Sequence, residues 1–176
     1  MRNVALIALG FSLLVMGAAA ATFVPFHAVA PNLLLPVVIF LGVTHEVHIV
    51  RGAALSFVFG YLFDAFTGSP MGLMTFVLVA TFIVARFAGL RLFLRGPIFQ
   101  ILLTFFVAVL AGGTILALRA IFEKPAPFPA GTVEDHVLTL LIPAATTALV
   151  SPLVFAAVRR IESLAVRKRE ERPATP

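Results

Sequence analysis

The 176-residue sequence contains no cysteine and no tryptophan, and only 12% of its residues are charged. Without cysteine, the chain forms no disulfide bond and offers no thiolate to a metal. Soluble domains carry roughly 25% charged residues, so a surface of ordinary soluble composition is excluded. The sequence also lacks a phosphate-binding Walker loop, a G-x-S-x-G nucleophile turn and a dinucleotide-binding glycine pattern. We therefore expect a protein that is not an enzyme and that needs no cofactor.

Long hydrophobic runs dominate the chain. Hydrophobic residues make up 61% of it, and its mean hydropathy is +1.09. A helix that crosses a membrane needs about 20 apolar residues. Six runs approach or reach this length, at residues 4–24, 33–48, 51–66, 70–87, 98–122 and 137–158. The sequence predicts an all-α integral membrane protein, with a compact bundle of about six transmembrane helices over residues 1–158 and a charged cytoplasmic tail at 159–176.

Alternatives remain for three of these runs. Those at 33–48 and 51–66 are short, so the sequence leaves open whether both span the membrane fully. The run at 4–24 has an alternative interpretation as a signal peptide. It is longer than the roughly 7–15 apolar residues of a signal-peptide core, and we interpret it as the first span.

The basic residues indicate how the bundle is oriented. If the N-terminus is cytoplasmic, the outer side keeps only Arg119 and Lys124 of the 13 basic residues. The others lie at inner ends, at positions 2, 51, 86, 91, 95, 159, 160, 167, 168, 169 and 172. This asymmetry follows the positive-inside rule, and it predicts an even number of spans with both termini in the cytoplasm. Basic residues at segment ends indicate contact with membrane lipid rather than with nucleic acid.

Small residues recur at every fourth position of the third run, and residues four apart share one face of a helix. The set is Gly52, Ser56, Gly60, Asp64 and Gly68. Small side chains at this spacing let a second helix approach closely, so we predict a helix-packing or partner-binding face. A carboxylate is costly in lipid, and its place on this face indicates that Asp64 faces protein.

The stretch after Asp64 predicts a tight hairpin. Gly68 suits the left-handed residue that ends a helix. Ser69 is a good N-cap and Pro70 a good first residue of the next helix, and Gly72 completes the predicted hairpin cap. Asp64 would then lie near the free amides and the positive dipole end of the fourth helix. Three roles stay open: a tie between two helices, a proton or ion site, and a contact to a partner subunit. As a tie, Asp64→Asn should be mild, because an amide oxygen still accepts hydrogen bonds.

The segment at 44–48 contains His45, Glu46 and His48, which are metal-ligand residue types. The histidines are three apart, whereas the zinc-protease pattern H-E-x-x-H places them four apart. No third ligand is evident. We therefore expect a polar turn and no metal site.

The sixth run carries two prolines, Pro143 and Pro152, with the hydroxyl residues Thr146, Thr147 and Ser151 between them. Proline bends helices and frees carbonyls, and nearby hydroxyls can satisfy the freed groups. The bent helix either lines a cavity, as in transporters, or serves packing.

The hairpin region resembles the rod shape-determining MreD family, in which a helix ending G-x-x-x-D precedes a short turn and a P-L-G-like start of the next helix. The matching residues are Gly60, Asp64, Gly68, Ser69, Pro70, Gly72 and Leu73. The stretch "PNLLLPVVIFLGV" at 31–43 is similar to the family's second segment, with Asn32 where Asp is frequent. The resemblance is carried by residues 31–95 and elsewhere extends only to hydropathy.

This resemblance implies a non-enzymatic scaffold of the cell-elongation machinery in the bacterial inner membrane. It implies an MreC-like membrane partner, with MreB, RodA and an elongation transpeptidase nearby, and a role in rod shape and in organising peptidoglycan synthesis. The family is also similar to the six-helix substrate-binding subunits of energy-coupling-factor (ECF) transporters. The alternative function is therefore a substrate-binding membrane subunit of a vitamin-type transporter. Its cavity would be lined by Tyr61, Thr146, Thr147 and Ser151.

Overall fold

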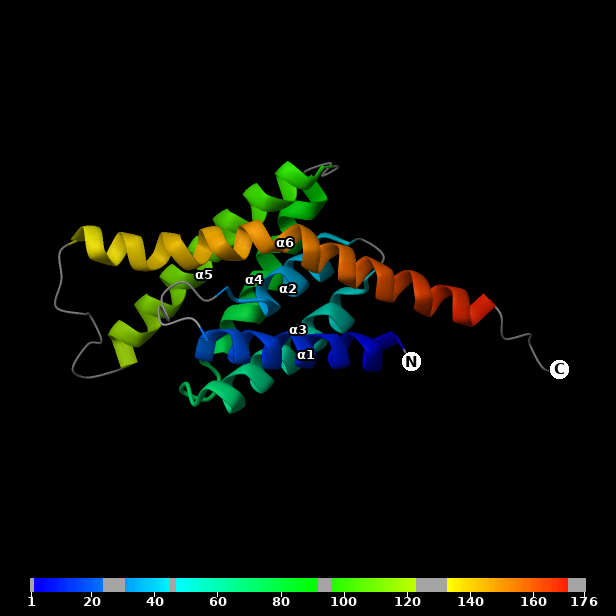
Figure 1. The fold of residues 1–176 in the computed structure, drawn as a ribbon, viewed down its shortest axis with the longest axis horizontal. Helices are drawn as coiled ribbons and strands as arrows, with labels where there is room; N and C mark the ends of the chain where they lie inside the picture. Colours follow the sequence, from blue (N-terminus) through cyan, green and yellow to red (C-terminus); the bar gives the residue numbers. More distant parts are fainter. Residues whose placement is uncertain (1, 24–30, 45–46, 92–95, 123–132, 171–176) are drawn as a thin grey trace.

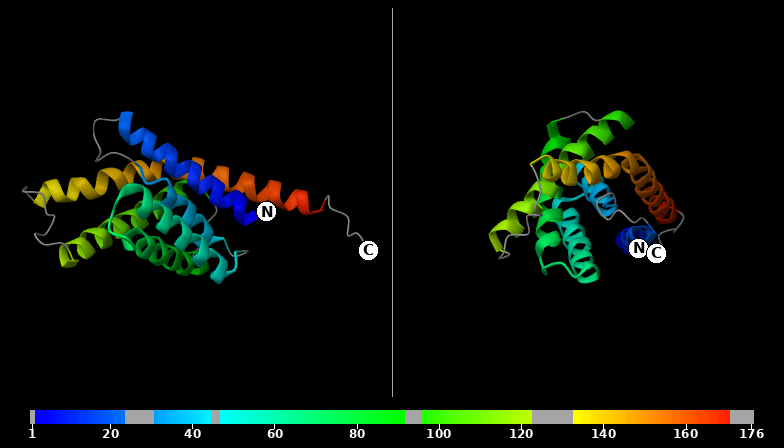
Figure 2. Two further views of the ribbon diagram at one scale, coloured as in Figure 1. Left: turned by 90° about the horizontal axis from the view of Figure 1, so that it is seen from below. Right: turned by 60° about the vertical axis from the view of Figure 1, so that its left-hand side comes forward.

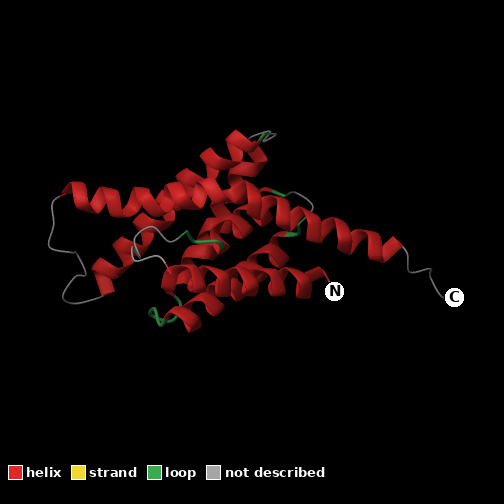
Figure 3. Cartoon of the chain, in the orientation of Figure 1, coloured by secondary structure: helices red, strands yellow, loops and turns green. Residues whose placement is uncertain are grey.

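The computed structural model describes residues 2–23, 31–44, 47–91, 96–122 and 133–170. These residues form helices joined by turns, without a strand, which confirms the all-α prediction (Figure 3). The helices are α1 (Arg2–Phe23), α2 (Leu34–Val43), α3 (Ile49–Thr67), α4 (Leu73–Arg91), α5 (Pro97–Phe122) and α6 (Val133–Glu170). Each corresponds to one of the six hydrophobic runs.

The helices form a bundle in which α1 and α6 lie along one side and run in opposite directions (Figure 1). The N-terminal end of α1 and the C-terminal end of α6 lie at the same end of the bundle, as the two views of Figure 2 confirm. The turn between α3 and α4 lies at the opposite end. This end is called the hairpin end below.

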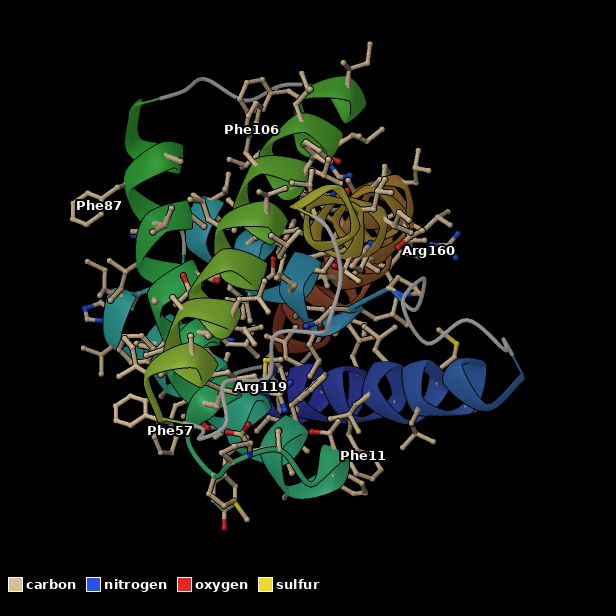
Figure 4. The ribbon with its side chains drawn as sticks, turned by 90° about the vertical axis from the view of Figure 1, so that its left-hand side faces the viewer. Phe11, Phe57, Phe87, Phe106, Arg119 and Arg160 are labelled. Carbon is tan, nitrogen blue, oxygen red and sulfur yellow. The ribbon has the colours of Figure 1, made fainter. Side chains whose placement is uncertain are left out.

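Three helical segments have the length and apolar composition of a membrane span: Ile49–Thr67, Ile98–Phe122 and Val137–Ser163. The most apolar stretch of α5 has only 17% of its residues buried inside the protein. Large apolar side chains cover the outside of the bundle, and Figure 4 shows Phe57, Phe87 and Phe106 there, each more than half exposed. A surface of this kind is typical of contact with lipid, and together with the three membrane-length segments it is consistent with a membrane protein. The full count of six spans stays a prediction.

The helix formed by the second hydrophobic run is much shorter than the predicted segment 33–48. α2 has 10 residues, a length of about 15 Å, roughly half the hydrocarbon core of a bilayer. Eight of its residues are buried, since a helix that is apolar all round is stable in a protein core. After Val43 the chain turns, and both the amide and the hydroxyl of Thr44 bond to the Phe40 carbonyl.

The core has two parts that meet at α2. Leu34, Val37 and Leu41 of this helix pack in a cluster with side chains of α1, α3, α4 and α6. Leu35 and Ile39 pack in a second cluster with side chains of α4, α5 and α6. α2 is therefore the buried centre around which the other helices are arranged.

The last helix continues beyond the predicted end of the membrane domain at residue 158. α6 runs without interruption to Glu170, and Val158 and Ile161 still pack against the first core cluster. The helix bends along its course (Figure 2), and it contains Pro143 and Pro152, the usual cause of such bends.

Candidate functional site

The small-residue face of α3 packs directly on α4. Gly52, Ser56, Gly60 and Asp64 are buried. A Cβ atom on Gly60 would lie 2.8 Å from the Thr75 amide nitrogen and 2.9 Å from the Met74 carbonyl oxygen. These are backbone atoms of the first turn of α4, so no side-chain rotation can make room. A Cβ atom on Gly52 would meet the ring of Phe82, two turns further along α4.

Ser56 has its hydroxyl occupied within its own helix. Its Oγ donates to the Gly52 carbonyl at 2.9 Å. Gly68, the fifth member of the predicted face, lies beyond the helix and is exposed, with no atom within 4 Å of an added Cβ. Gly68 therefore does not belong to the packing face. It ends α3 with φ 65°, the left-handed conformation predicted for it.

The Asp64 carboxylate lies at the end of this face and is 1% exposed. Its Oδ1 accepts from the Met74 amide at 2.9 Å and from the Ser69 hydroxyl at 3.2 Å. Its Oδ2 accepts from the Gly72 amide at 3.0 Å, the Thr75 amide at 3.1 Å and the Thr75 hydroxyl at 2.9 Å. Hydrogen bonds to an ionised carboxylate are roughly twice as strong as neutral ones, which offsets the cost of burying the charge.

Through these contacts the Asp64 side chain caps the N-terminus of α4, although Asp64 belongs to the preceding helix. The first amides of a helix have no partner within the helix. Here the Leu73 amide bonds to Pro70 O at 3.1 Å and the Phe76 amide to Gly72 O at 2.9 Å. The amides between them bond to Asp64. The residue just before the helix is Gly72, which has φ 97° and no side chain, so the cap must come from elsewhere.

The predicted helix start at Ser69 and Pro70 is wrong. α4 begins at Leu73, because the Asp64 carboxylate is a stronger acceptor for first-turn amides than the Ser69 hydroxyl. Ser69 instead donates to Asp64 and shares a 2.8 Å hydrogen bond with the Thr67 hydroxyl. The Ser69 hydroxyl of the turn therefore bonds to the carboxylate, and the Thr67 hydroxyl at the end of α3 bonds to Ser69.

The geometry also changes the expectation for Asp64→Asn. Both carboxylate oxygens accept a backbone amide. An asparagine has one oxygen, and its NH₂ group would face donors on the other side. The substitution therefore removes hydrogen bonds and places the new NH₂ group against a backbone N–H donor. We now expect Asp64→Asn to destabilise the protein rather than to be mild.

Thr75 is a member of the site that the sequence analysis missed. Both its amide and its hydroxyl bond to Asp64, and it is 7% exposed. The predicted start at Pro70 placed Thr75 beyond the first turn. Thr75 is the third residue of α4 only because the helix begins at Leu73, so the sequence carried no clear capping signal for it.

A second close contact, between α2 and α4, was also missed. A Cβ atom added at Gly42 would lie 2.7 Å from Ala85 Cβ, and one added at Gly89 would lie 2.9 Å from Val43 Cα. Arg86 Nη1 donates to the Thr44 carbonyl at 2.8 Å and more weakly to the Gly42 carbonyl at 3.5 Å. A cation at the C-terminal end of a helix is favourable, so Arg86 caps α2. The sequence analysis used Arg86 only as an orientation signal.

The remaining candidates do not form a second polar site. His45 and Glu46 lie outside the described residues, and His48 is exposed just before α3. Among the residues that the structure describes, no group of three His, Cys, Asp or Glu side chains is arranged to hold a metal ion. Tyr61 is 53% exposed on the outside of α3.

The hydroxyl groups of α6 serve mainly the helix itself. Ser151 donates to the Ala148 carbonyl at 2.7 Å, which is the carbonyl that Pro152 leaves without its helical donor. Thr146 donates to carbonyls one turn before it. Thr147 donates to the Pro143 carbonyl at 2.6 Å and accepts from the Asn32 amide at 3.0 Å. Of the predicted cavity liners, Thr147 is the one that borders a partly open cavity between the helices.

Comparison with known families places the chain in one of them. The family model described as rod shape-determining protein MreD matches residues 1–161 of the chain. Comparisons with curated proteins and with solved structures find no match. The expected likeness to ECF transporter subunits therefore stays a prediction.

Proposed function

Because the chain belongs to the MreD family of rod shape-determining proteins, we propose that it is a non-enzymatic scaffold of the bacterial cell-elongation machinery. Family membership supports a role in rod-shape determination. The finer proposal is that the protein holds an MreC-like partner in the inner membrane, with MreB, RodA and an elongation transpeptidase nearby. Through this assembly it organises peptidoglycan synthesis along the side wall.

The observation that carries the scaffold role is the complete use of Asp64 inside its own hairpin. A carboxylate offers about four lone-pair sites, and Asp64 accepts five hydrogen bonds from four residues of the turn and of α4. No acceptor site is left for a transported ion or for a water molecule in a proton relay. This supports the role of a tie between two helices over the roles of an ion site and a direct contact to a partner.

The arrangement of the charges supports insertion with both termini in the cytoplasm. The start of α1 and the end of α6 share one end of the bundle. Arg86, one of the predicted inner-end residues, binds the C-terminal end of α2. Arg119 lies in the last turn of α5, at the hairpin end. With the positive-inside rule, the hairpin end faces away from the cytoplasm.

A cell-shape experiment tests the wall-organising role. Cells lacking the protein receive either the wild-type chain or Gly60→Leu, which fills the contact between α3 and α4. Newly made peptidoglycan is labelled with a fluorescent D-amino acid. We expect wild-type cells to be rods with label along the side wall, and Gly60→Leu cells to be round with dispersed label. Gly113→Leu is the matched control, because a Cβ at Gly113 meets nothing within 4 Å. Side-wall labelling that is independent of the protein would refute the proposal.

The vitamin-type transport subunit remains the second candidate because the bundle contains a cavity of about 320 Å³ between α2, α4, α5 and α6. Its lining argues for a different kind of occupant. Tyr61, Thr146 and Ser151 do not border it, and most of the residues that do are apolar. Recovery of ATPase and coupling subunits with the purified protein would support this candidate.

A further inference from the structure

The cavity between α2, α4, α5 and α6 is partly open and lies in the half of the bundle near the hairpin end. Val77, one half-turn beyond the Asp64-bound Thr75, forms part of its wall, and so does Asn32, two residues before the start of α2. α5 and α6 provide most of the remaining wall, on the side that faces the viewer in Figure 4. A volume of about 320 Å³ is at the lower end of the roughly 300–1,000 Å³ of small-molecule sites.

The lining contains no charged side chain. Leu35, Val77, Ala111, Ile115 and Leu140 are typical of its apolar wall. Burying a net charge against such a wall without a partner is strongly unfavourable. The part of an occupant that enters the cavity is therefore neutral and mostly apolar.

Asn32 provides a hydrogen-bond donor at the rim of this wall. Its backbone amide donates to the Thr147 hydroxyl, and its Oδ1 accepts from the Leu34 amide at 3.2 Å. Thr147 in turn donates to the Pro143 carbonyl. These bonds engage Oδ1 of the Asn32 side chain, and among the described residues Nδ2, which only donates, has no partner. The complementary group on an occupant is an acceptor such as a carbonyl oxygen.

The membrane supplies a molecule with these properties at high concentration. The cavity is partly open at the surface of the bundle, and α5 and α6, which form most of its wall, contain membrane-length apolar segments, so lipid can reach it. A lipid combines an apolar chain with an ester carbonyl at the polar end of that chain. We propose that the cavity binds one acyl chain of a membrane lipid, with an ester carbonyl accepting a hydrogen bond from Asn32 Nδ2. This site is separate from the Asp64 hairpin and extends beyond the scaffold role.

Two neighbouring glycines of α5 offer a matched test. Gly112 borders the cavity, and a Cβ there would lie 2.9 Å from Leu140 Cδ2, another lining atom. Gly112→Leu therefore fills the cavity. A Cβ at the adjacent Gly113 meets nothing within 4 Å, so Gly113→Leu adds the same side chain without filling it. The purified, delipidated full chain is titrated with dioleoylphosphatidylethanolamine and examined by native mass spectrometry.

We expect wild type and Gly113→Leu to retain one lipid per chain and Gly112→Leu to retain none. Asn32→Asp keeps the oxygen that accepts from the Leu34 amide but removes the donor, and we expect about tenfold weaker lipid binding, the value of roughly one hydrogen bond. Asn32→Asp decides the question if Gly112→Leu does not fold. Equal lipid retention by Gly112→Leu or by Asn32→Asp would overturn the proposal. So would the absence of a bound lipid in the wild type, or a tightly bound metabolite that is not a lipid.

Discussion

Asp64→Asn is the most informative single substitution, because it removes the charge and one acceptor while preserving the size of the side chain. In its better orientation, the amide oxygen takes the place of Oδ2 and keeps the bonds from Gly72 and Thr75. The NH₂ group then replaces Oδ1 and faces the Met74 amide and the Ser69 hydroxyl. Ser69 can turn toward the exposed Thr67, but the Met74 amide is fixed in the helix.

The cost follows from these two changes. A buried donor without an acceptor costs about 1–3 kcal/mol, and loss of a negative charge at a helix N-terminus costs about 0.3–2 kcal/mol. The expected destabilisation of Asp64→Asn is therefore roughly 1–5 kcal/mol. For a chain of this size, about 1 kcal/mol corresponds to a change in Tm of roughly 2–4 °C. Thermal unfolding of the purified protein in mild detergent measures it.

Two further variants at the same site provide a graded control. Ser69→Ala removes one bond from a partly exposed donor and should cost less than about 1 kcal/mol. Thr75→Val removes the hydroxyl bond but keeps the amide bond, and it should cost about 1 kcal/mol. Stability should fall in the order Ser69→Ala, Thr75→Val, Asp64→Asn. If Asp64→Asn were as stable as Ser69→Ala, the assignment of Asp64 as the cap of α4 would be refuted.

Two other substitutions test the remaining helix contacts in the same unfolding assay. Gly60→Ala places a Cβ against the backbone of Thr75 and should cost about 1–3 kcal/mol of stability by overpacking. Gly113→Ala, with open space around it, should be neutral or slightly stabilising. Equal stability of the two variants would show that α3 and α4 are not in close contact. Arg86→Met removes the donor to the Thr44 carbonyl and should cost about 1–3 kcal/mol of stability. Arg160→Met, on the exposed side of α6, should stay within about 0.5 kcal/mol of wild type. An unchanged Tm for Arg86→Met would exclude the role of Arg86 as the α2 cap.

The sequence predicts the packing face of α3 because its signal is local. Spacing by four brings Gly52, Ser56, Gly60 and Asp64 to one side of a helix. The structure buries all four and places Gly52, Gly60 and Asp64 against α4. The start of α4 could not be predicted in the same way. Ser69–Pro70 is a favourable local start, but the acceptor that fixes the helix at Leu73 comes from the preceding helix.

The extent and burial of α2 were also beyond the sequence. Hydropathy does not distinguish an apolar face in lipid from one in a protein core, so 33–48 had the composition of a short span. The structure buries α2 among the other helices and ends it at Val43, where Arg86 of α4 binds the following carbonyl. Such a contact between segments 42 residues apart leaves no periodic signal in the sequence.

The scaffold role is tested most directly by affinity purification of the tagged protein from its native membranes in mild detergent, with mass spectrometry of whatever accompanies it. The account predicts that an MreC-like protein and wall-elongation proteins accompany the wild-type chain, and that their yield falls for Gly60→Leu but not for Gly113→Leu. Recovery of ATPase and coupling subunits instead, or equal partner yield from both variants, would contradict it.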